Sequence, residues 1–477
     1  MHKINRTFVV SGTFLFVVAA AMAAPAQTFK TLANFNGTNG ANPDFVSLVQ
    51  GWDGNLYGTT AYGGLNGYGT VFQVTPSGTV TTLYSFCAQT NCIDGSVPEA
   101  GLVLATDGTF YGTTDEGGIY SDCDFVCGTV FEVTRQGTLN TLYSFDINSH
   151  GANPEAALIQ DGDGNFYGTT SAEDLSSVFE ITSGGALTTL HNLNMSEGAQ
   201  PHAALVQADG YLYGTTGFFG AYGSGTVFKI TPKGAFTTLY NFCSKAHCAD
   251  GSVPVAALVP GPDGEFYSTT TSGGANDVCL NGGCGTVFKM SSDGRLTTLH
   301  SFDGTDGSSP GGLVLGTDGS FYGVASNGGG SDACPNGCGT IFKMTPDGAL
   351  TTLHAFGSTD GAYPTGALVQ ATDGLFYGVT FAGGPNGDGT IFSLSVGLGP
   401  FVETQRTAGK VGQPVKILGT DLTGATSLTF NGTPATFTVV SPSLIKTTVP
   451  AGATSGTVQV VTPGGTLSSK AAFRVLP

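Results

Sequence analysis

Residues 203–242 read AALVQADGYLYGTTGFFGAYGSGTVFKITPKGAFTTLYNF, a stretch with four short runs of apolar and β-branched residues. Each run is bounded by Gly, Pro, Asp or Asn, which is typical of β-strands. The first two runs are separated by Asp-Gly and the last two by Pro-Lys-Gly. Both separators favour tight turns. The stretch therefore predicts a four-stranded antiparallel meander.

The same four runs recur along the chain with small variations. The clearest marker is the FYGTT-like phrase, whose tyrosines lie 46 to 56 residues apart: Tyr57, Tyr111, Tyr167, Tyr213, Tyr267, Tyr322 and Tyr377. The blades of β-propellers have four strands, number about four to eight, and in kelch-type proteins repeat at about 50 residues. We therefore predict an all-β fold in which residues 28–398 form a seven-bladed β-propeller.

The two ends of the repeat region predict how the ring closes. The last repeat has no fourth run after Gly389–Ser395, whereas a matching run, TFKTLANF, stands by itself at Thr28–Phe35. An open array of blades would leave two unpaired strand edges, which promote aggregation. We therefore expect the N-terminal strand to complete the last blade.

The composition excludes several other classes of protein. The chain has 75 Gly among 477 residues, a density that disfavours long helices. Hydrophobic residues make up 40% of the chain, so it has enough apolar surface to form a core and avoid disorder. The formal net charge of −18 argues against a nucleic-acid partner and against a polybasic membrane-surface protein.

The first 26 residues predict export. Lys3 and Arg6 precede an apolar run of 14 residues, Phe8–Ala21, and small residues follow it. This order is typical of a secretory signal peptide, and a membrane span needs roughly 20 apolar residues. We expect cleavage within residues 23–27 and a mature protein with no transmembrane segment. Its expected location is secreted or extracytoplasmic, in the periplasm or at the cell surface.

Residues 400–477 differ from the rest of the chain, because they lack the repeat and contain no Cys. Short alternating runs occur there, for example Pro414–Leu418 and Ser427–Phe430, and an Asn431-Gly432 turn follows the second. This pattern predicts a small immunoglobulin-like β-sandwich.

Both parts of the chain resemble known families. The pieces GQPVKILGTDL, SLTFNGTPATF, LIKTTVPAG and GTVQVVTPGG resemble the IPT/TIG domain, which implies an accessory module of surface proteins that serves as spacer or adhesion unit. The phrases YGTT…GG…GTVF…TLYSF, over Thr28–Val396, resemble the Gloeo/Verruco (GloVer) tandem repeat of bacterial extracytoplasmic proteins. The second resemblance implies no particular activity.

Cysteines occur as five close pairs, all in predicted loops. An even number of cysteines in an exported protein favours disulfides. A metal site would need several ligands gathered at one point, for which CxxxC or CxxxxC alone is a weak signal. Pairing stays open where one blade carries two pairs. The pairs are Cys87/Cys92, Cys123/Cys127, Cys243/Cys248, Cys279/Cys284 and Cys334/Cys338.

One face of the propeller should carry the loops of variable length, where binding sites are usually built. The residue after the Pro that precedes each first strand would lie there, at the mouth of the central channel. In the first four repeats these residues are Asp44, Glu99, Glu155 and His202. They could bind a cation such as calcium, act as acid and base, or form a solvated acidic rim.

Aromatic residues crowd the loops between second and third strands on the same face. They could stack on sugars or peptides, or simply cover the ends of the blades. The residues are Tyr62, Tyr68, Tyr120, Phe125, Phe218, Phe219, Tyr222 and Phe381. By contrast, His191, His300 and His354 replace tyrosines of the fourth strand, and we expect them to be structural.

These observations favour a binding or adhesion protein that is a monomer and recognises a glycan or a cell-surface protein through the loop face. The alternative is an extracellular polysaccharide lyase or glycosidase with its site at the channel mouth, which rests on fold analogy. A third possibility is a purely structural envelope protein. No sequence motif of a known catalytic type supports the enzyme.

Overall fold

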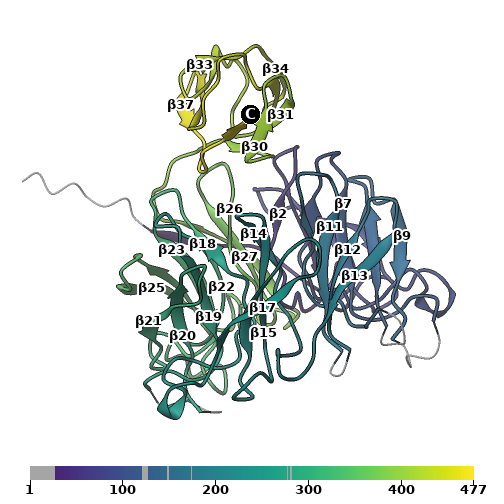
Figure 1. The fold of residues 1–477 in the computed structure, drawn as a ribbon, viewed down its shortest axis with the longest axis vertical. Coiled ribbons are helices and arrows are strands. Elements are labelled where there is room, and N and C mark those ends of the chain that lie inside the picture. Colours follow the sequence, from purple (N-terminus) through teal and green to yellow (C-terminus); the bar gives the residue numbers. More distant parts are fainter. Residues whose placement is uncertain (1–26, 121–126, 148–149, 173–174, 277, 280–281) are drawn as a thin grey trace, which may run out of the picture.

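The computed structural model describes residues 27–120, 127–147, 150–172, 175–276, 278–279 and 282–477. The predicted signal peptide and Phe125 lie outside these residues. Within them the fold is all-β, with two short 3₁₀ turns, η1 (Thr90–Cys92) and η2 (Ala246–Cys248), and no α-helix (Figure 1). None of the described segments is a helix long and apolar enough to cross a membrane.

The repeat region forms seven four-stranded antiparallel sheets, numbered here in chain order. The second, third and fourth strands of each sheet lie within two residues of the runs predicted from sequence. Sheet 1 contains β2 (Val49–Gln50), β3 (Leu56–Thr60), β4 (Thr70–Val74) and β5 (Val80–Ser85); sheet 2 contains β6 (Val103–Leu104), β7 (Phe110–Thr114), β8 (Thr129–Val133) and β9 (Leu139–Ser144); sheet 3 contains β10 (Ile159–Gln160), β11 (Phe166–Thr170), β12 (Ser177–Ile181) and β13 (Leu187–Asn192); sheet 4 contains β14 (Val206–Ala208), β15 (Tyr211–Thr216), β16 (Thr226–Ile230) and β17 (Phe236–Asn241).

The later sheets follow the same order, and the last one takes its outer strand from the N-terminus. Sheet 5 contains β18 (Val259–Pro260), β19 (Phe266–Thr270), β20 (Thr286–Met290) and β21 (Leu296–Ser301); sheet 6 contains β22 (Ser308–Leu315), β23 (Phe321–Asn327), β24 (Thr340–Met344) and β25 (Leu350–Ala355); sheet 7 contains β26 (Val369–Gln370), β27 (Phe376–Thr380), β28 (Thr390–Ser395) and β1 (Thr28–Asn34).

The first strand of each sheet is short, with β22 the one long exception. The two threonines of the YGTT phrase make hydrogen bonds between sheets and within a sheet. Thr59 Oγ1 donates to the carbonyl oxygen of Ala100 in the next sheet at 2.7 Å. The second threonine bonds within its own sheet, with 2.8 Å between the Oγ1 atoms of Thr60 and Thr70.

The aromatic pair of the FYGTT phrase packs neighbouring sheets together. Tyr57 of sheet 1 lies against Phe110 of sheet 2 with ring centroids 4.2 Å apart, and Tyr267 lies against Phe321 at 4.1 Å. Both tyrosine side chains are fully buried, and the Tyr57 hydroxyl donates to Asp53 in the preceding turn at 2.7 Å. The repeated tyrosines therefore belong to the cores between sheets.

The first and last sheets of the chain are in contact. Strand β1 pairs with β28 from Thr28↔Ser395 to Asn34↔Thr390. A further apolar cluster joins sheet 7 to sheet 1, with Tyr377, Val379 and Ile391 on one side and Leu56, Phe72 and Val74 on the other.

The loops that follow β5, β13, β17, β21 and β25 repeat one polar motif. Tyr84 donates to the buried Asp94 at 2.8 Å, and Tyr240 donates to the buried Asp250 at 2.7 Å. Where a histidine replaces the tyrosine it makes the same type of bond to an acidic residue, as His300 Nε2 does to Asp306 at 2.6 Å. The three histidines are thus hydrogen-bonded structural residues, as their position in the repeat predicts.

We expect Asp250→Ala to lower the free energy of unfolding by about 3 kcal/mol, because it leaves buried donors without an acceptor. Asp250 accepts bonds from the Tyr240 hydroxyl, the Ser244 hydroxyl and the backbone N–H groups of Ser244 and Lys245. Denaturant unfolding measures the loss, and Asp332→Ala, at an exposed loop residue, is the control.

The same variant should also change how stability depends on pH. Burial by itself raises the pKa of Asp250, but hydrogen bonds from Ser244 and Tyr240 outweigh it and hold the pKa below the ordinary 3.8. The stabilisation is therefore present above pH 3.8 and is lost as pH falls through the lower folded-state pKa. Equal stability of Asp250→Ala and the parent at pH 7 would contradict this account.

Residues 401–477 form a β-sandwich. One sheet has the order β29 (Glu403–Thr404), β31 (Pro414–Leu418), β35 (Leu444–Thr448), β34 (Phe437–Ser441), and the other has β33 (Thr433–Pro434), β32 (Ser427–Phe430), β36 (Val458–Thr462), β37 (Gly465–Ser468). A parallel pair, β30 (Ala408–Lys410) and β38 (Arg474–Leu476), joins the edges. Buried residues of both sheets form one core, which includes Ile417, Phe430, Ile445 and Val460.

Disulfides occur as predicted for the cysteines that the structure describes in full. Every bond is local, joining residues four or five positions apart, and no described cysteine is free. Cys123, the predicted partner of Cys127, lies outside the described residues. Disulfides of this number fit an extracytoplasmic protein. The bonds are Cys87–Cys92, Cys243–Cys248, Cys279–Cys284 and Cys334–Cys338.

Candidate functional site

The loops that enter each sheet and the loops between its second and third strands lie on one face, called here the loop face. Backbone bridges connect the two kinds of loop, such as Ala41 with Tyr62, Ser96 with Glu116, and Ala199 with Phe218. The Asp-Gly turns between first and second strands lie at the other end of the sheets. The predicted site residues therefore belong to one face of the molecule.

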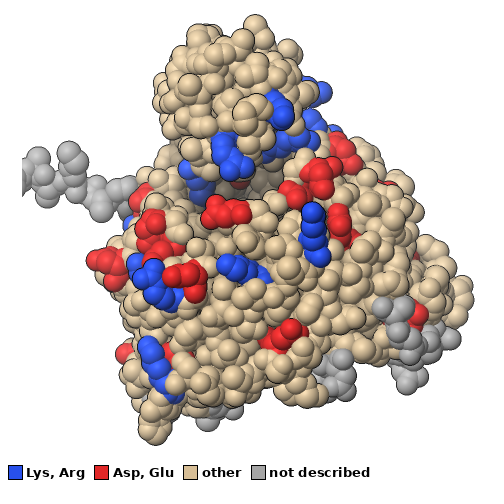
Figure 2. All heavy atoms as spheres, viewed as in Figure 1, with Lys and Arg blue, Asp and Glu red and all other residues tan. Residues whose placement is uncertain are grey.

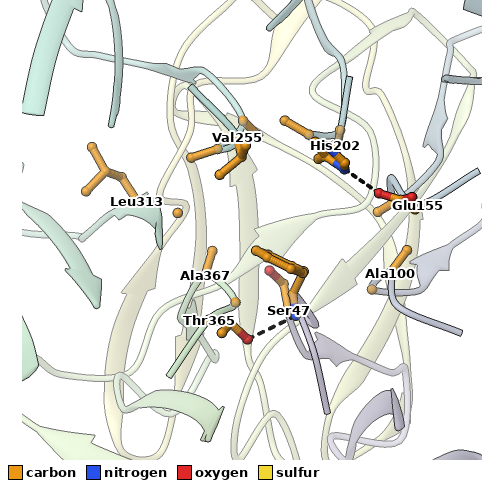
Figure 3. A pocket seen from close by; sticks show the side chains of 17 residues that line it. Ser47, Ala100, Glu155, His202, Val255, Leu313, Thr365 and Ala367 are labelled. Carbon is orange, nitrogen blue, oxygen red and sulfur yellow. Dashed lines mark hydrogen bonds and ion pairs between the residues drawn. The ribbon is translucent and has the colours of Figure 1, made fainter. Parts of the chain in front are cut away.

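A cavity of about 100 Å³ lies where the seven first strands converge. Each of the seven sheets contributes residues to its wall, and most of them are Ala or Gly, which leave the centre open (Figure 3). Glu155 and His202 are the charged or titratable residues of the lining. On the opposite side, Thr365 Oγ1 accepts a 3.0 Å hydrogen bond from the backbone N–H of Phe45.

Glu155 and His202 form an ion pair at the edge of this cavity. His202 Nδ1 bonds to one carboxylate oxygen of Glu155 (Figure 3). The Ser171 hydroxyl donates to the other carboxylate oxygen at 2.8 Å. Their side chains are 24% and 25% exposed. Burial alone raises the pKa of Glu155, but the bonds from His202 and Ser171 bring it below its ordinary value, so this carboxylate is ionised at neutral pH.

The other acidic residues near the cavity have raised pKa values, in contrast to Glu155. Burial, followed by the negative charges of Asp115, Asp44 and Glu155, raises the pKa of Glu99 to about 8. Burial and the charge of Glu155 raise the pKa of Asp115 to about 7. Burial also raises the pKa of Asp44. We call Asp44, Glu99, Asp115, Glu116 and Glu155 the acidic cluster.

Aromatic side chains stand exposed beside this cluster. Phe45, in the wall of the cavity, is 47% exposed, and Tyr62 is 46% exposed. Burial, followed by the charge of Glu99, raises the pKa of Tyr62, which places its hydroxyl near the cluster. Further out on the loop face are Tyr68, Tyr120, Phe218 and Tyr222, all exposed, whereas Phe219 and Phe381 are half-buried.

The four predicted channel residues do share one region, but only Glu155 and His202 line the cavity. The negative charge of Asp44 lies close enough to Glu99 to contribute to the raised pKa of Glu99. Sequence reasoning missed Asp115 and Glu116, which directly follow the second YGTT phrase. The available signal was their charge, because the other six repeats have uncharged residues at both positions. Among the described residues, no three His, Cys, Asp or Glu side chains are placed to hold a metal ion.

The fold and the loop face define a class of protein: an all-β repeat protein with propeller-like four-stranded sheets, exposed loops and a C-terminal β-sandwich. Within this class, the chain belongs to the Gloeobacter/Verrucomicrobia repeat family, whose model matches residues 20–176, 88–280 and 246–433. Residues 402–475 match the IPT/TIG domain. Both matches confirm the resemblances found in the sequence.

Solved structures show weaker likeness. A protein from Lactobacillus plantarum is 16% identical, with a TM-score of 0.44 over 80% of this chain and 92% of that chain. A putative gluconolactonase is 13% identical, with a TM-score of 0.35 over 57% of this chain and 82% of its own. TolB from Acinetobacter baumannii is 14% identical, with a TM-score of 0.35 over 57% of this chain and 61% of that chain. No functionally curated protein matches the chain.

Proposed function

We propose that the protein is an exported binding protein that recognises a carbohydrate or a surface protein through its loop face. In this proposal the seven sheets are the blades of a closed propeller, and β1 completes the last blade. The pairing of β1 with β28, the core between sheets 7 and 1, and the cavity with walls from all seven sheets support closure.

The observation that carries the binding proposal is the group of exposed aromatic side chains on the loop face, from Phe45 in the cavity wall outward. Phe45, Tyr62, Phe218 and Tyr222 are between 39% and 58% exposed. Aromatic rings offer large, rigid faces that pack well against sugars and peptides, and contiguous exposed apolar surface usually marks a binding site.

The size of the cavity favours a ligand that lies across the face. Pockets for small molecules have volumes of about 300–1,000 Å³. The cavity between the sheets, at about 100 Å³, is well below this range. A sugar chain or a protein segment would therefore contact the aromatic residues on the outside, with the acidic cluster beneath it.

The test is a glycan-array and surface-protein binding screen with the mature protein. We expect retention of at least one ligand, and a loss of about tenfold or more in affinity when Tyr62 and Tyr222 are both changed to Ala. Val440→Ala, at an exposed residue of the C-terminal sandwich, is the matched control. Binding that is equal in the parent and in the double variant would overturn the proposal.

One observation favours the enzymatic alternative. Glu99 has a pKa of about 8 and Glu155 has a lowered pKa, so one carboxyl group is protonated and the other ionised at neutral pH. Two carboxyl groups with separated pKa values are the arrangement used by acid–base catalysts such as glycosidases. Product analysis of every retained glycan tests this alternative. Cleavage that is lost in Glu99→Gln would support it, and intact glycan would exclude it.

A further inference from the structure

The C-terminal sandwich packs against the end of the sheets opposite the loop face. Figure 1 shows it above the ends of β26 and β2, which belong to sheets 7 and 1. Its hydrogen bonds also reach the turn that precedes β7 of sheet 2. Its contacts with these three sheets are specific. They fall on the turns between first and second strands, where the sequence places short Asp-Gly turns.

Contacts with sheet 7 are made next to the connection between the two parts of the chain. The backbone N–H of Phe401 donates to the carbonyl oxygen of Thr372 at 3.0 Å. The Thr372 hydroxyl lies 2.9 Å from the hydroxyl of Thr420 in the sandwich. Thr372 is completely buried, so these bonds lie inside the contact.

Contacts with sheets 1 and 2 use three polar side chains of the sandwich. Ser443 Oγ donates to the carbonyl oxygen of Trp52 at 2.7 Å. Gln405 Nε2 donates to the carbonyl oxygen of Ala105 at 2.7 Å, and Lys416 Nζ donates to that of Thr106 at 2.9 Å.

Trp52, the one tryptophan of the chain, is held between two parts of this contact. Lys416 Nζ lies 3.3 Å from the centre of its ring, a cation–π contact. On the other side the ring lies against Gly108 of sheet 2, where a Cβ atom would come within 2.2 Å of the ring. Trp52 of sheet 1 thus contacts both the next sheet and the sandwich.

The two parts of the chain carry opposite charges. Residues 401–477 contain six Lys or Arg and two Asp or Glu, which gives a formal charge of +4. Residues 27–400 contain eight Lys or Arg and 32 Asp or Glu, which gives a formal charge of −24. Figure 2 shows basic side chains on the underside of the sandwich and acidic ones on the surface below it. The net attraction favours the docked arrangement.

The contacts of the sandwich connect sheets that lie at opposite ends of the repeat region in the sequence. Sheet 7 is held together across the pairing of β28 with β1, and no covalent link crosses that pairing. The sandwich is covalently joined to β28, yet it also contacts sheets 1 and 2, which are covalently joined to β1. A bridge of this kind opposes the separation of sheet 7 from sheet 1, and with it the separation of β28 from β1.

We propose that the C-terminal sandwich is a clasp, docked across sheets 7, 1 and 2, that holds the β1–β28 pairing closed. The resemblance to the IPT/TIG domain alone implied a spacer or an adhesion unit. A clasp has a fixed position on the sheets, and it leaves the loop face free.

The test compares full-length Lys416→Ala/Ser443→Ala with the parent and with Lys410→Ala, at an exposed lysine of the same sandwich. We expect the fluorescence of Trp52 to change in the double variant and not in the control. Amide hydrogen exchange of β1 and β28 should become about tenfold faster in the double variant, since the opening of that pairing then meets less resistance. Unchanged exchange of β1 and β28 would overturn the clasp.

A second measurement leaves Lys416 and Ser443 unchanged, so it does not depend on whether the substituted protein folds. A protease site inserted between Gly397 and Leu398 allows the connection to be cut after folding. A clasp should remain bound to the sheets after cleavage, so that both fragments elute together in size-exclusion chromatography. A sandwich that elutes separately from the cut protein would show that it is a tethered spacer.

Discussion

Removal of Thr28–Phe35 is expected to abolish cooperative unfolding and to make the protein aggregate. The strand supplies the whole outer edge of sheet 7 and pairs with β28. Phe29 stacks on His354 with ring centroids 3.8 Å apart, and Phe35 is fully buried against Phe72. The loss of one such aromatic residue from a core costs about 3–5 kcal/mol. The loss of both, together with a strand, exceeds the stability of many domains.

The measurement combines calorimetry with size-exclusion chromatography. Without the strand, β28 presents an unpaired edge, which can bind a second chain, so we expect soluble oligomers or precipitate. A chain that begins at Thr28 retains the strand and serves as the control. If the shorter chain remains monomeric and melts in one transition at the temperature of the control, then the N-terminal strand does not close the sheets.

Most of the fold could be predicted from the sequence, because one repeat unit determines it. The FYGTT and GTVF phrases give strand positions to within two residues, and the absence of a fourth run after Ser395 indicates where Thr28–Asn34 belongs. The first strands were harder to predict. Their predicted runs, such as ALVQ, have four residues, whereas most of these strands pair over only two residues.

The site was predicted only in part. The position after the recurring Pro identifies Glu155 and His202, because four of the seven copies of that position, Glu155, His202, Val255 and Thr365, line the cavity. Asp115 and Glu116 follow a different phrase of the repeat, and only folding brings them beside Glu99. The contact between Lys416 and Trp52 could not be predicted either, since it depends on how two separately folded parts of the chain dock.

Neutralising Glu99 and Asp115 together is expected to stabilise the protein at pH 8.5 and to have little effect at pH 4. In the unfolded chain these groups have ordinary pKa values of 4.5 and 3.8, whereas in the folded protein burial and neighbouring carboxylates raise them to about 8 and about 7. The folded state therefore binds more protons than the unfolded state between these values.

Well below pH 3.8 both groups are protonated in the folded and in the unfolded chain, so they do not change the free energy of unfolding. As pH rises, the unfolded chain releases its protons first, so the free energy of unfolding falls until both groups are ionised in the folded state near pH 8. Glu99→Gln/Asp115→Asn removes this loss. Solvent screens these partly exposed groups and reduces the gain well below the value that the full pKa shifts would give, so we expect a gain on the order of 2–4 kcal/mol at pH 8.5, measured by denaturant unfolding across this pH range.

The control must change the net charge by the same amount without touching the acidic cluster. Asp209→Asn/Asp332→Asn does so at two exposed loop residues. If general repulsion in an acidic protein were responsible, both double variants would gain the same stability at pH 8.5. If burial beside the cavity is responsible, only Glu99→Gln/Asp115→Asn gains it, and its stability becomes nearly independent of pH above 4. A variant that is less stable than the parent at pH 8.5 would mean that the charged forms of Glu99 and Asp115 hold this part of the loop face together.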